Sequence, residues 1–359
     1  MSTEEANMAR LSLSRRIAAS VTAAALAALA LAGCSSASPS SSSSGGGSNS
    51  SLPTLVLGSP GIPPVISGLL PYIADKQGFY KKYGVNVTIK SFQTGTDATR
   101  AVAAGQIDLA IMPPAQLLEL TSQGQQLVAL QGQQFPDWVV ASTDPNVNSC
   151  SALKGKTIGV DAIGGIRYIA LLQMLRTCNL SINDVHPLAF PGNANPQALV
   201  AGQLQVSVLH LNETVDVNAQ GKKLTTAIKM SQAVPNTMYE MYGTTKANLA
   251  KNRSAYVKLI AAQIATIKWM NDPKNADQVA QLATVVGDQK ASLLNSMAQY
   301  RALNFWSSAD AALPQLNINN TIKAQVAAGN VKADKAPTYA QITDLSVYSD
   351  AAKLVASNP

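Results

Sequence analysis

The sequence predicts an α/β protein built from two lobes, and three observations lead to this fold class. Residues 52–359 exceed what one hydrophobic core usually organises. Short apolar strands alternate with amphipathic helices along this part, a pattern typical of mostly parallel sheets covered by helices. A polar break at Asp144-Pro145-Asn146 separates a first strand–helix series from a second. We therefore expect two lobes that face each other across a cleft, joined by two crossover strands, and a helical C-terminal region.

The first 51 residues are expected to be an export signal and a tether. Three arginines precede an uncharged apolar run over 17–32, which is the layout of a secretory signal and is too short and Ala-rich for a permanent span. The tetrad Leu31-Ala32-Gly33-Cys34 resembles the bacterial lipobox, which implies cleavage after residue 33 and a lipid on Cys34; an ordinary secretory signal is the alternative. Residues 35–51 are nearly all Ser, Gly, Pro, Ala and Asn, so 34–51 would form a flexible tether.

The first lobe is predicted from a strand–helix–strand series. Gly84 ends its longest helix, in which Pro71 lies in an early turn. The expected elements are strands at 54–57, 85–89 and 107–112, a Gly/Pro loop at 58–64, and helices at about 67–83, at 96–105 and from Pro113 to Gly124.

The second lobe repeats the alternation after the polar break. Its expected elements are strands at 157–160, 185–190 and 206–211, a helix at about 165–177 and a helix ending at Gly202. Strands at 135–143 and 237–243 would connect the lobes, and helices would follow from Lys246, the clearest at 253–270. The expected domains are therefore lobe one at 52–143 and 244–359, and lobe two at 144–243.

Composition excludes several classes of function. The net charge of +7 would suit nucleic acid, but no basic run is longer than two residues, so we expect no nucleic-acid partner. His186 and His210 are the only histidines and have no ligand at metal-binding spacing, so we expect no metal and no cofactor. Without a serine nucleophile elbow or a Walker-type loop, the chain is not expected to be an enzyme.

Two cysteines remain once Cys34 is assigned to lipid. In an oxidising compartment Cys150 and Cys178 would pair, closing a loop of about 29 residues for roughly 3–4 kcal/mol of stability. Two separately buried thiols are the alternative.

Four stretches, taken in order, resemble a known family. They are LPYIADKQGFYKKYGVNV (70–87), AVAAGQIDLAIMPPA (101–115), LKGKTIGV (153–160) and ALVAGQLQVSVLHLNE (198–213). Together they are similar to the periplasmic-binding-protein-like type II fold, in the branch of sulfonate, nitrate and thiamine-precursor binding proteins (NMT1/THI5-like and SsuA-like). This resemblance implies an extracytoplasmic protein, anchored to the cell membrane by its N-terminal lipid, that delivers a small solute to the permease subunits of an ABC importer as a monomer.

Loops that follow the predicted parallel strands should line the cleft, where helix N-termini direct free N–H groups at a ligand. The candidate ligand-binding residues are Ile62, Pro63, Thr94, Gly95, Thr96, Pro113, Pro114, Trp138, Gly164, Gly165, Arg167, His210, Asn212 and Glu213.

Arg167 is the most informative of these candidates, because a cation at a helix start is disfavoured by the helix dipole and calls for a partner. It would either pair with an anionic ligand such as a carboxylate or sulfonate, or form a salt bridge to Asp161 or face solvent. On the first reading the solute is anionic.

The other candidates also have structural alternatives. Thr94 and Thr96 would donate hydrogen bonds to the ligand, or Thr96 would cap the following helix. His210 and Glu213 would bind the ligand or serve the fold, and Trp138 would offer a stacking surface or fill the core. Two other functions remain open: a surface sensor without transport, and an enzyme of the THI5-like type.

Overall fold

The computed structural model describes residues 52–358, except 134–135, 191–193 and 308. The expected signal peptide at 1–33, the expected lipidation site at Cys34 and the tether at 34–51 lie outside the described residues. Within the described ranges, no helix combines the length and the apolar character that crossing a membrane requires.

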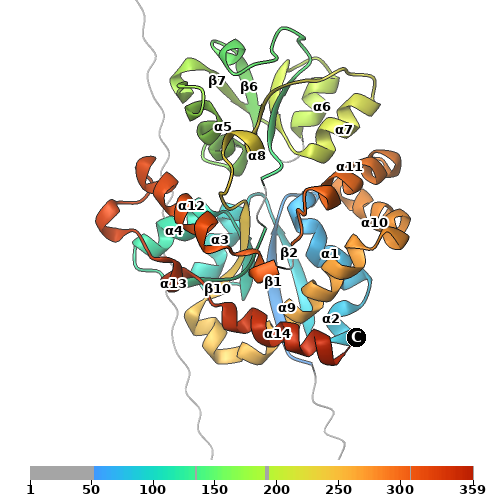
Figure 1. Ribbon diagram of the computed structural model, residues 1–359, viewed down its shortest axis with the longest axis vertical. Coiled ribbons are helices and arrows are strands. Elements are labelled where there is room, and N and C mark those ends of the chain that lie inside the picture. The colour runs from blue at the N-terminus through green and yellow to red at the C-terminus, as the bar shows by residue number, and fades with distance from the viewer. Residues whose placement is uncertain (1–51, 134–135, 191–193, 308, 359) are drawn as a thin grey trace, which may run out of the picture. The chain divides into compact units, whose positions relative to one another are not determined.

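Two five-stranded sheets organise the described residues (Figure 1). The first has the strand order β2-β1-β3-β10-β4, and the second has the order β7-β6-β8-β5-β9. The strands of the first sheet are β1 (Thr54–Pro60), β2 (Asn86–Phe92), β3 (Leu109–Met112), β4 (Leu127–Gln133) and β10 (Glu240–Thr245). The strands of the second sheet are β5 (Val139–Ser142), β6 (Thr157–Val160), β7 (His186–Ala189), β8 (Val206–Leu209) and β9 (Thr225–Lys229).

Both sheets are mixed rather than mostly parallel. In each, the first three strands pair in parallel, and one strand runs antiparallel between the third strand and the edge: β10 in the first sheet and β5 in the second. These two strands enter from the other lobe, so they run opposite to the strands that a βαβ connection produces. The two-lobed α/β fold class predicted from the sequence is confirmed.

The chain passes from the first lobe to the second immediately before β5, and it returns to the first lobe immediately before β10. Because β5 pairs only within the second sheet and β10 only within the first, we propose lobe boundaries somewhat earlier than residues 143 and 243. They would lie between Gln133 and Val139, and between Lys229 and Glu240.

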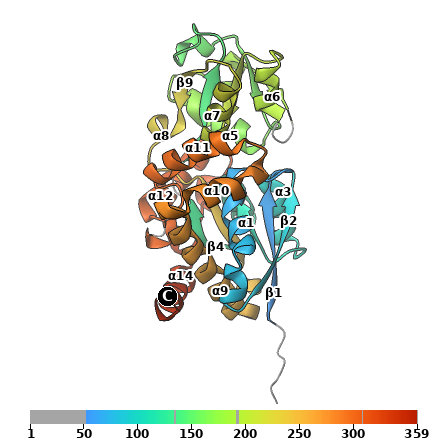
Figure 2. The ribbon, with the colours of Figure 1, turned by 90° about the vertical axis from the view of Figure 1, so that its right-hand side faces the viewer.

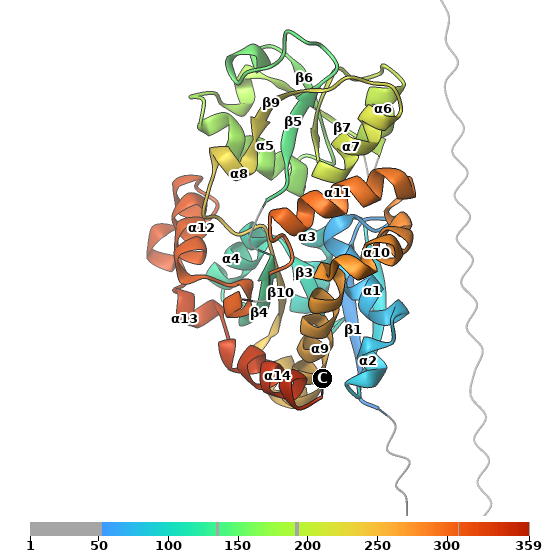
Figure 3. The ribbon, with the colours of Figure 1, turned by 45° about the vertical axis from the view of Figure 1, so that its right-hand side comes forward.

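Side chains alternate along each strand, so the two faces of a sheet carry different helices. Leu55 and Leu57 of β1 join a buried cluster with α1 and α9, while Met112 of β3 joins another with α3 and α4. Figure 3 shows α1 and α9 beside β1, and in the second sheet α5 covers one face and α6 and α7 the other. The helices of the two lobes are α1 (Leu69–Lys76), α2 (Phe79–Lys82), α3 (Gly95–Ala103), α4 (Pro114–Ser122), α5 (Ile166–Arg176), α6 (Ala194–Val200), α7 (Leu211–Ala219) and α8 (Met230–Ala233).

The C-terminal region is helical, as the sequence predicts, and one part of it reaches the second lobe. Helix α11 packs against α10 (Figure 2) and also against α7 of the second lobe (Figures 1 and 3). The helices of this region are α9 (Lys246–Asn271), α10 (Ala276–Ala283), α11 (Lys290–Ala302), α12 (Gln315–Ala327), α13 (Tyr339–Ile342) and α14 (Leu345–Ser357).

Some elements differ from the sequence prediction. The helix expected over 67–83 is divided into a 3₁₀ turn, α1 and α2, because Gly78 adopts a left-handed φ of 72° at the start of α2. The strands β4 and β9 and the helix α7 were not predicted. Strand β4 begins with four apolar residues, ends in Gln131-Gly132-Gln133 and is buried throughout, and so short an apolar run does not by itself distinguish a strand from a helix.

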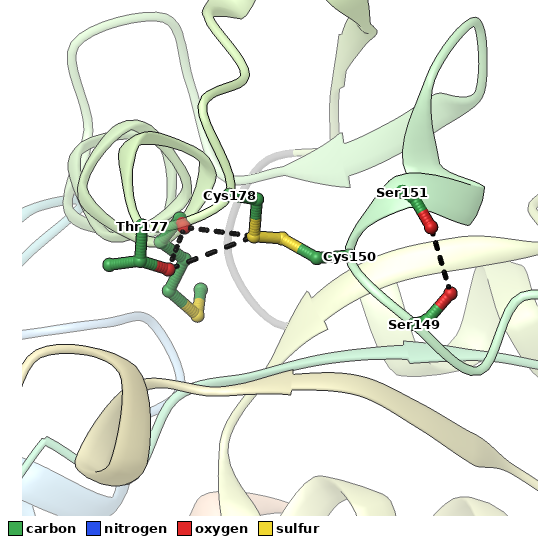
Figure 4. Close-up of a disulfide and its surroundings, with 6 residues drawn as sticks. Ser149, Cys150, Ser151, Thr177 and Cys178 are labelled. Atoms are coloured by element: carbon green, nitrogen blue, oxygen red, sulfur yellow. Dashed lines mark hydrogen bonds between the residues drawn. A yellow bond between two sulfur atoms is a disulfide. The ribbon is translucent and has the colours of Figure 1, made fainter.

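Cys150 and Cys178 form a disulfide within the second lobe (Figure 4). Their Cα atoms are 5.9 Å apart, and the bridge ties the chain just after α5 to the loop before the 3₁₀ helix Ser151–Leu153. It thereby fixes the C-terminal end of α5, whose N-terminal end lies at the site described next.

Candidate functional site

A cavity of about 170 Å³ lies where strands of both sheets end, and we call it the inner cavity. The first lobe contributes the residues after β1 and β2 and the start of β10, and the second lobe contributes the residues after β6 and β8. The carboxyl ends of parallel strands are where open α/β sheets place ligands. Its polar and aromatic lining includes Ser67, Thr94, Trp138, Asp161, Arg167, His210, Tyr239 and Glu240.

The guanidinium of Arg167 forms its hydrogen bonds within the second lobe itself. Its Nη1 and Nη2 donate to the two carboxylate oxygens of Glu213 at 2.7 and 2.6 Å, and Nη1 also donates to the carbonyl of Val208 at 2.8 Å. Both side chains are almost completely buried. Burial alone would raise the pKa of Glu213, but the charge of Arg167 and its hydrogen bonds to the carboxylate hold that pKa below its usual value.

This geometry answers the question of a partner for Arg167. The partner is Glu213, not Asp161, and the guanidinium is neither exposed nor left with a free charge for a ligand. Trp138 lies against the same group, with Cζ of Arg167 at 5.0 Å from the ring centroid.

His210 is held in the same way by an acidic neighbour. Its Nδ1 lies 3.0 Å from Oδ1 of Asp137, and its ring stacks on Trp138 with the centroids 3.7 Å apart. Burial would raise the pKa of Asp137, yet the charge of His210 and the hydrogen bonds of this cluster hold it below its usual value. An ionised Asp137 can only accept, so Nδ1 of His210 carries a proton.

Tyr300 of α11 links this cluster to α7. Its hydroxyl lies against the carboxylate of Asp137 and accepts a hydrogen bond from the backbone N–H of Asn212 at 3.2 Å. The side chain of Asn212 donates in turn to Asp288 at 2.6 Å. Asn212, a candidate ligand contact, is therefore occupied in joining the second lobe to the C-terminal helices.

Three polar groups at the floor of the inner cavity have no hydrogen-bond partner among the described residues. They are the Ser67 hydroxyl, the Tyr239 hydroxyl and Oε2 of Glu240, all buried. Burial, together with the charge of Asp137, raises the pKa of Glu240 to about 8, although nearby Ser67 lowers it somewhat. Buried polar groups are rarely left without partners, so these three are available to a ligand.

Both glycines in the loop before α5 have a structural reason. Gly164 adopts a left-handed φ of 82°, and a Cβ on Gly165 would come within 2.6 Å of the Asp161 carboxylate. Thr94 caps α3 by accepting from the N–H of Asp97 at 3.1 Å, so the capping residue is Thr94 rather than Thr96.

The sequence-predicted candidates fall into several neighbouring cavities. Thr94, Gly95, Trp138, Arg167 and His210 line the inner cavity. An outer cavity of about 480 Å³, which shares Thr94 and Ala162 with the inner one, is lined by Thr96, Gly164 and Gly165.

The remaining candidates do not line the inner cavity. Pro113 and Pro114 line a smaller space beside Trp138, and Pro63, Asn212 and Glu213 line a cavity of about 200 Å³ on the α7 side. Ile62 is 51% exposed and is not among the residues that line these four cavities. Whether any of these residues contacts a ligand stays a prediction.

Sequence reasoning missed Tyr239, Glu240, Ser67 and Asp137 as site residues. Glu240 carried a usable signal, because a glutamate within the otherwise apolar run MYEMYG is unusual for a strand expected to be buried. Asp137 and Ser67 carried none, since nothing local distinguishes them from ordinary loop and helix-start residues. Within the described ranges, no three His, Cys, Asp or Glu side chains gather closely enough to hold a metal ion.

Comparison with known proteins agrees with this architecture. Over 135 residues the chain is 26% identical to a binding protein of Brucella abortus, a match that covers 38% of this chain and only 41% of that relative's length. Among solved structures, the periplasmic sulfonate-binding protein SsuA of Methylobacillus flagellatus superposes with a TM-score of 0.65 at 14% identity, covering 86% of this chain and 96% of that one. The periplasmic nitrate-binding protein NrtA of Synechocystis also gives a TM-score of 0.65 at 14% identity, covering 84% and 89%.

These solved structures share the fold with this chain, and at such low identity they show the fold alone. A sequence profile of the family described as NMT1/THI5 like matches residues 67–276, which is more than half of the chain and includes strands of both sheets. The chain therefore belongs to the NMT1/THI5-like family.

Proposed function

We propose that the protein is an extracytoplasmic solute-binding protein, anchored to the membrane by a lipid on Cys34, that delivers a small solute to the permease of an ABC importer. The observation that carries the proposal is the inner cavity, which is lined by both lobes and holds three buried polar groups without hydrogen-bond partners among the described residues. Closing two lobes over a solute would bury it and present one closed surface to a permease. We propose a monomer without a cofactor or a catalytic role.

The likeness to SsuA and NrtA supports this role through the shared fold. It does not extend to an anionic solute. The sequence-based argument for an anion depended on a free charge at Arg167, and that charge is compensated by Glu213 within the same lobe.

The binding role predicts that one chemical class of small solute raises the melting temperature of the purified protein. A solute present at 100 times its Kd stabilises the folded state by about 2.7 kcal/mol. The measurement is a thermal-shift screen of a broad metabolite collection, followed by uptake of each hit into cells with and without the gene. Binding without any loss of uptake would favour a sensor, and an empty screen would contradict the binding role.

The lipid anchor predicts a separate change. Replacing Cys34 with serine removes the acylated thiol, so the protein should move from the membrane fraction to the soluble extracellular or periplasmic fraction. Fractionation with immunoblotting measures this, and Ser36→Ala, two residues away, is the matched control that should remain with the membrane. A Cys34→Ser protein that stays in the membrane fraction contradicts the anchor.

A further inference from the structure

The charges that line the inner cavity are unevenly compensated. Its two basic side chains, among the described residues, are Arg167 and His210, and each is paired with an acidic partner: Glu213 for the first and Asp137 for the second. Neither therefore presents a free positive charge to a solute.

The acidic side chains of the same cavity are compensated less: the charge of Asp161 contributes to raising the pKa of Arg167, whereas no basic side chain is among the described groups that shift the pKa of Glu240. No salt bridge of Asp161 or Glu240 occurs within the described part of the chain, and both line the cavity. Glu240 is 1% exposed, and its Oε2 has no hydrogen-bond partner there. A buried carboxylate without a counter-ion is costly, and a positively charged solute would remove that cost.

The surroundings of Glu240 suit a protonated nitrogen. The Ser67 and Tyr239 hydroxyls lie on the same cavity, and each can accept an N–H group of a solute. Ser67 is close enough to Glu240 to act on its pKa, and the Tyr239 hydroxyl has no hydrogen-bond partner among the described residues. The ring of Tyr239 also lines the cavity, and aromatic faces attract cations. The ring of Trp138 already contacts His210 and Arg167. An anion would instead meet Asp161 and Glu240 with no free cation to bind it.

Building on the proposed function, we propose that the inner cavity takes a small solute with a protonated nitrogen, a primary ammonium or an amidinium, with Glu240 as its counter-ion. Ser67 and Tyr239 accept the remaining N–H groups, and Tyr239 contacts the cation through its ring. Arg167 has no contact with the solute's charge in this arrangement; it positions Trp138 and the start of α7.

Binding of such a solute should release a proton. The groups that face Glu240 are Ser67 from the 3₁₀ turn Ile66–Gly68, Asp137 from the crossover, Gln133 of β4, and Tyr239 and Tyr242 on its own segment; among these described neighbours none is a cation. With a pKa of about 8, Glu240 holds its proton at pH 7 in the free protein and gives it up when an ammonium arrives.

The experiment compares charge classes on the full chain carrying Cys34→Ser. Small cations with N–H groups (benzylamine, agmatine, putrescine), neutral benzyl alcohol, and small anions (nitrate, ethanesulfonate, benzenesulfonate) are tested by thermal shift and titration calorimetry. We expect binding among the cations alone, with about one proton released per solute at pH 7, read from buffers of different ionisation enthalpy. Glu240→Gln should weaken binding by roughly 10-fold to 100-fold and abolish proton release, whereas Asp334→Asn, an exposed loss of the same charge, should change neither.

Several results would overturn the assignment while leaving solute binding intact. They are hits confined to anions or to neutral molecules, a cation that binds Glu240→Gln as tightly as the unaltered protein, and binding without proton release. If no member of this panel binds, the cationic assignment fails, and the binding role itself fails only if the broad metabolite screen is also empty. Because the glutamine is isosteric with a carboxyl group that is neutral at pH 7, the variant should fold; Ser67→Ala, with a smaller expected loss of affinity, is the second variant.

Discussion

Replacing Arg167 with methionine should lower the free energy of unfolding by about 3–5 kcal/mol, the usual cost of leaving a buried charge without its partner. The carboxylate of Glu213 would keep only the backbone N–H of His210, from which it accepts at 2.7 Å, and would lose both guanidinium hydrogen bonds. Urea unfolding followed by far-UV circular dichroism measures the loss. The pair is nearly inaccessible to solvent, so screening by salt should change the result little.

The double variant Arg167→Met/Glu213→Leu tests whether the loss of stability comes from leaving one buried charge unpaired. Removing both charges should recover much of the lost stability, because two well-packed apolar side chains carry no buried charge. Arg100→Met is the control: its pair with Asp97 is 63% and 48% exposed, so the expected change is at most about 1 kcal/mol. If Arg167→Met were as mild as Arg100→Met, the pair would not be the structural element that we describe.

The second large effect concerns the stability of the ligand-free protein as a function of pH. Glu240 has its pKa raised from 4.5 to about 8 by burial and by the charge of Asp137, with Ser67 acting in the opposite sense. Between these two pH values the folded state keeps a proton that the unfolded chain has released, so stability falls as pH rises through this window and levels off above it. The shift corresponds to at most about 5 kcal/mol by pH 9.

Glu240→Gln removes the titrating group and should remove that decline. We expect the variant to match the unaltered protein in its free energy of unfolding near pH 5 and to exceed it at pH 9. Urea unfolding at pH 5, 7 and 9 provides the comparison, and Asp334→Asn should follow the unaltered protein throughout. Parallel pH curves for Glu240→Gln and the unaltered protein would mean that the carboxyl group is solvated, which would also weaken its assignment as a counter-ion.

Much of the fold could be predicted because its signals are local. The predicted strands at 54–57, 157–160 and 206–211 overlap β1, β6 and β8, which are short, rich in apolar residues and bounded by Gly, Pro or polar residues. The split between α1 and α2 was missed, because the periodicity continues across Gly78 and only the left-handed backbone of that residue interrupts the helix. The antiparallel position of β5 and β10 was missed because neighbouring strands in a sheet are chosen by contacts far along the chain.

The position of the candidate site could also be predicted from local signals, but the roles of its residues could not. Loops after parallel strands were expected at the cleft, and Thr94, Gly95, Arg167 and His210 from these loops do line the inner cavity. Trp138, predicted in the first strand that connects the lobes, lines it too. The roles within the cavity were harder to predict, since Arg167 meets Glu213 across 46 positions and His210 meets Asp137 across 73. No local pattern encodes which charge compensates which.

The sequence by itself determined the two-lobed α/β class, the alternation of strands and helices, and the loops that meet at the cleft, because periodicity and turn residues act between near neighbours in the chain. The tertiary structure alone decided that Arg167 is neutralised by Glu213 and that Glu240 has no counter-ion in the part of the chain that the structure describes. The physical reason is that charge compensation depends on distances of a few ångströms between segments that only packing brings together.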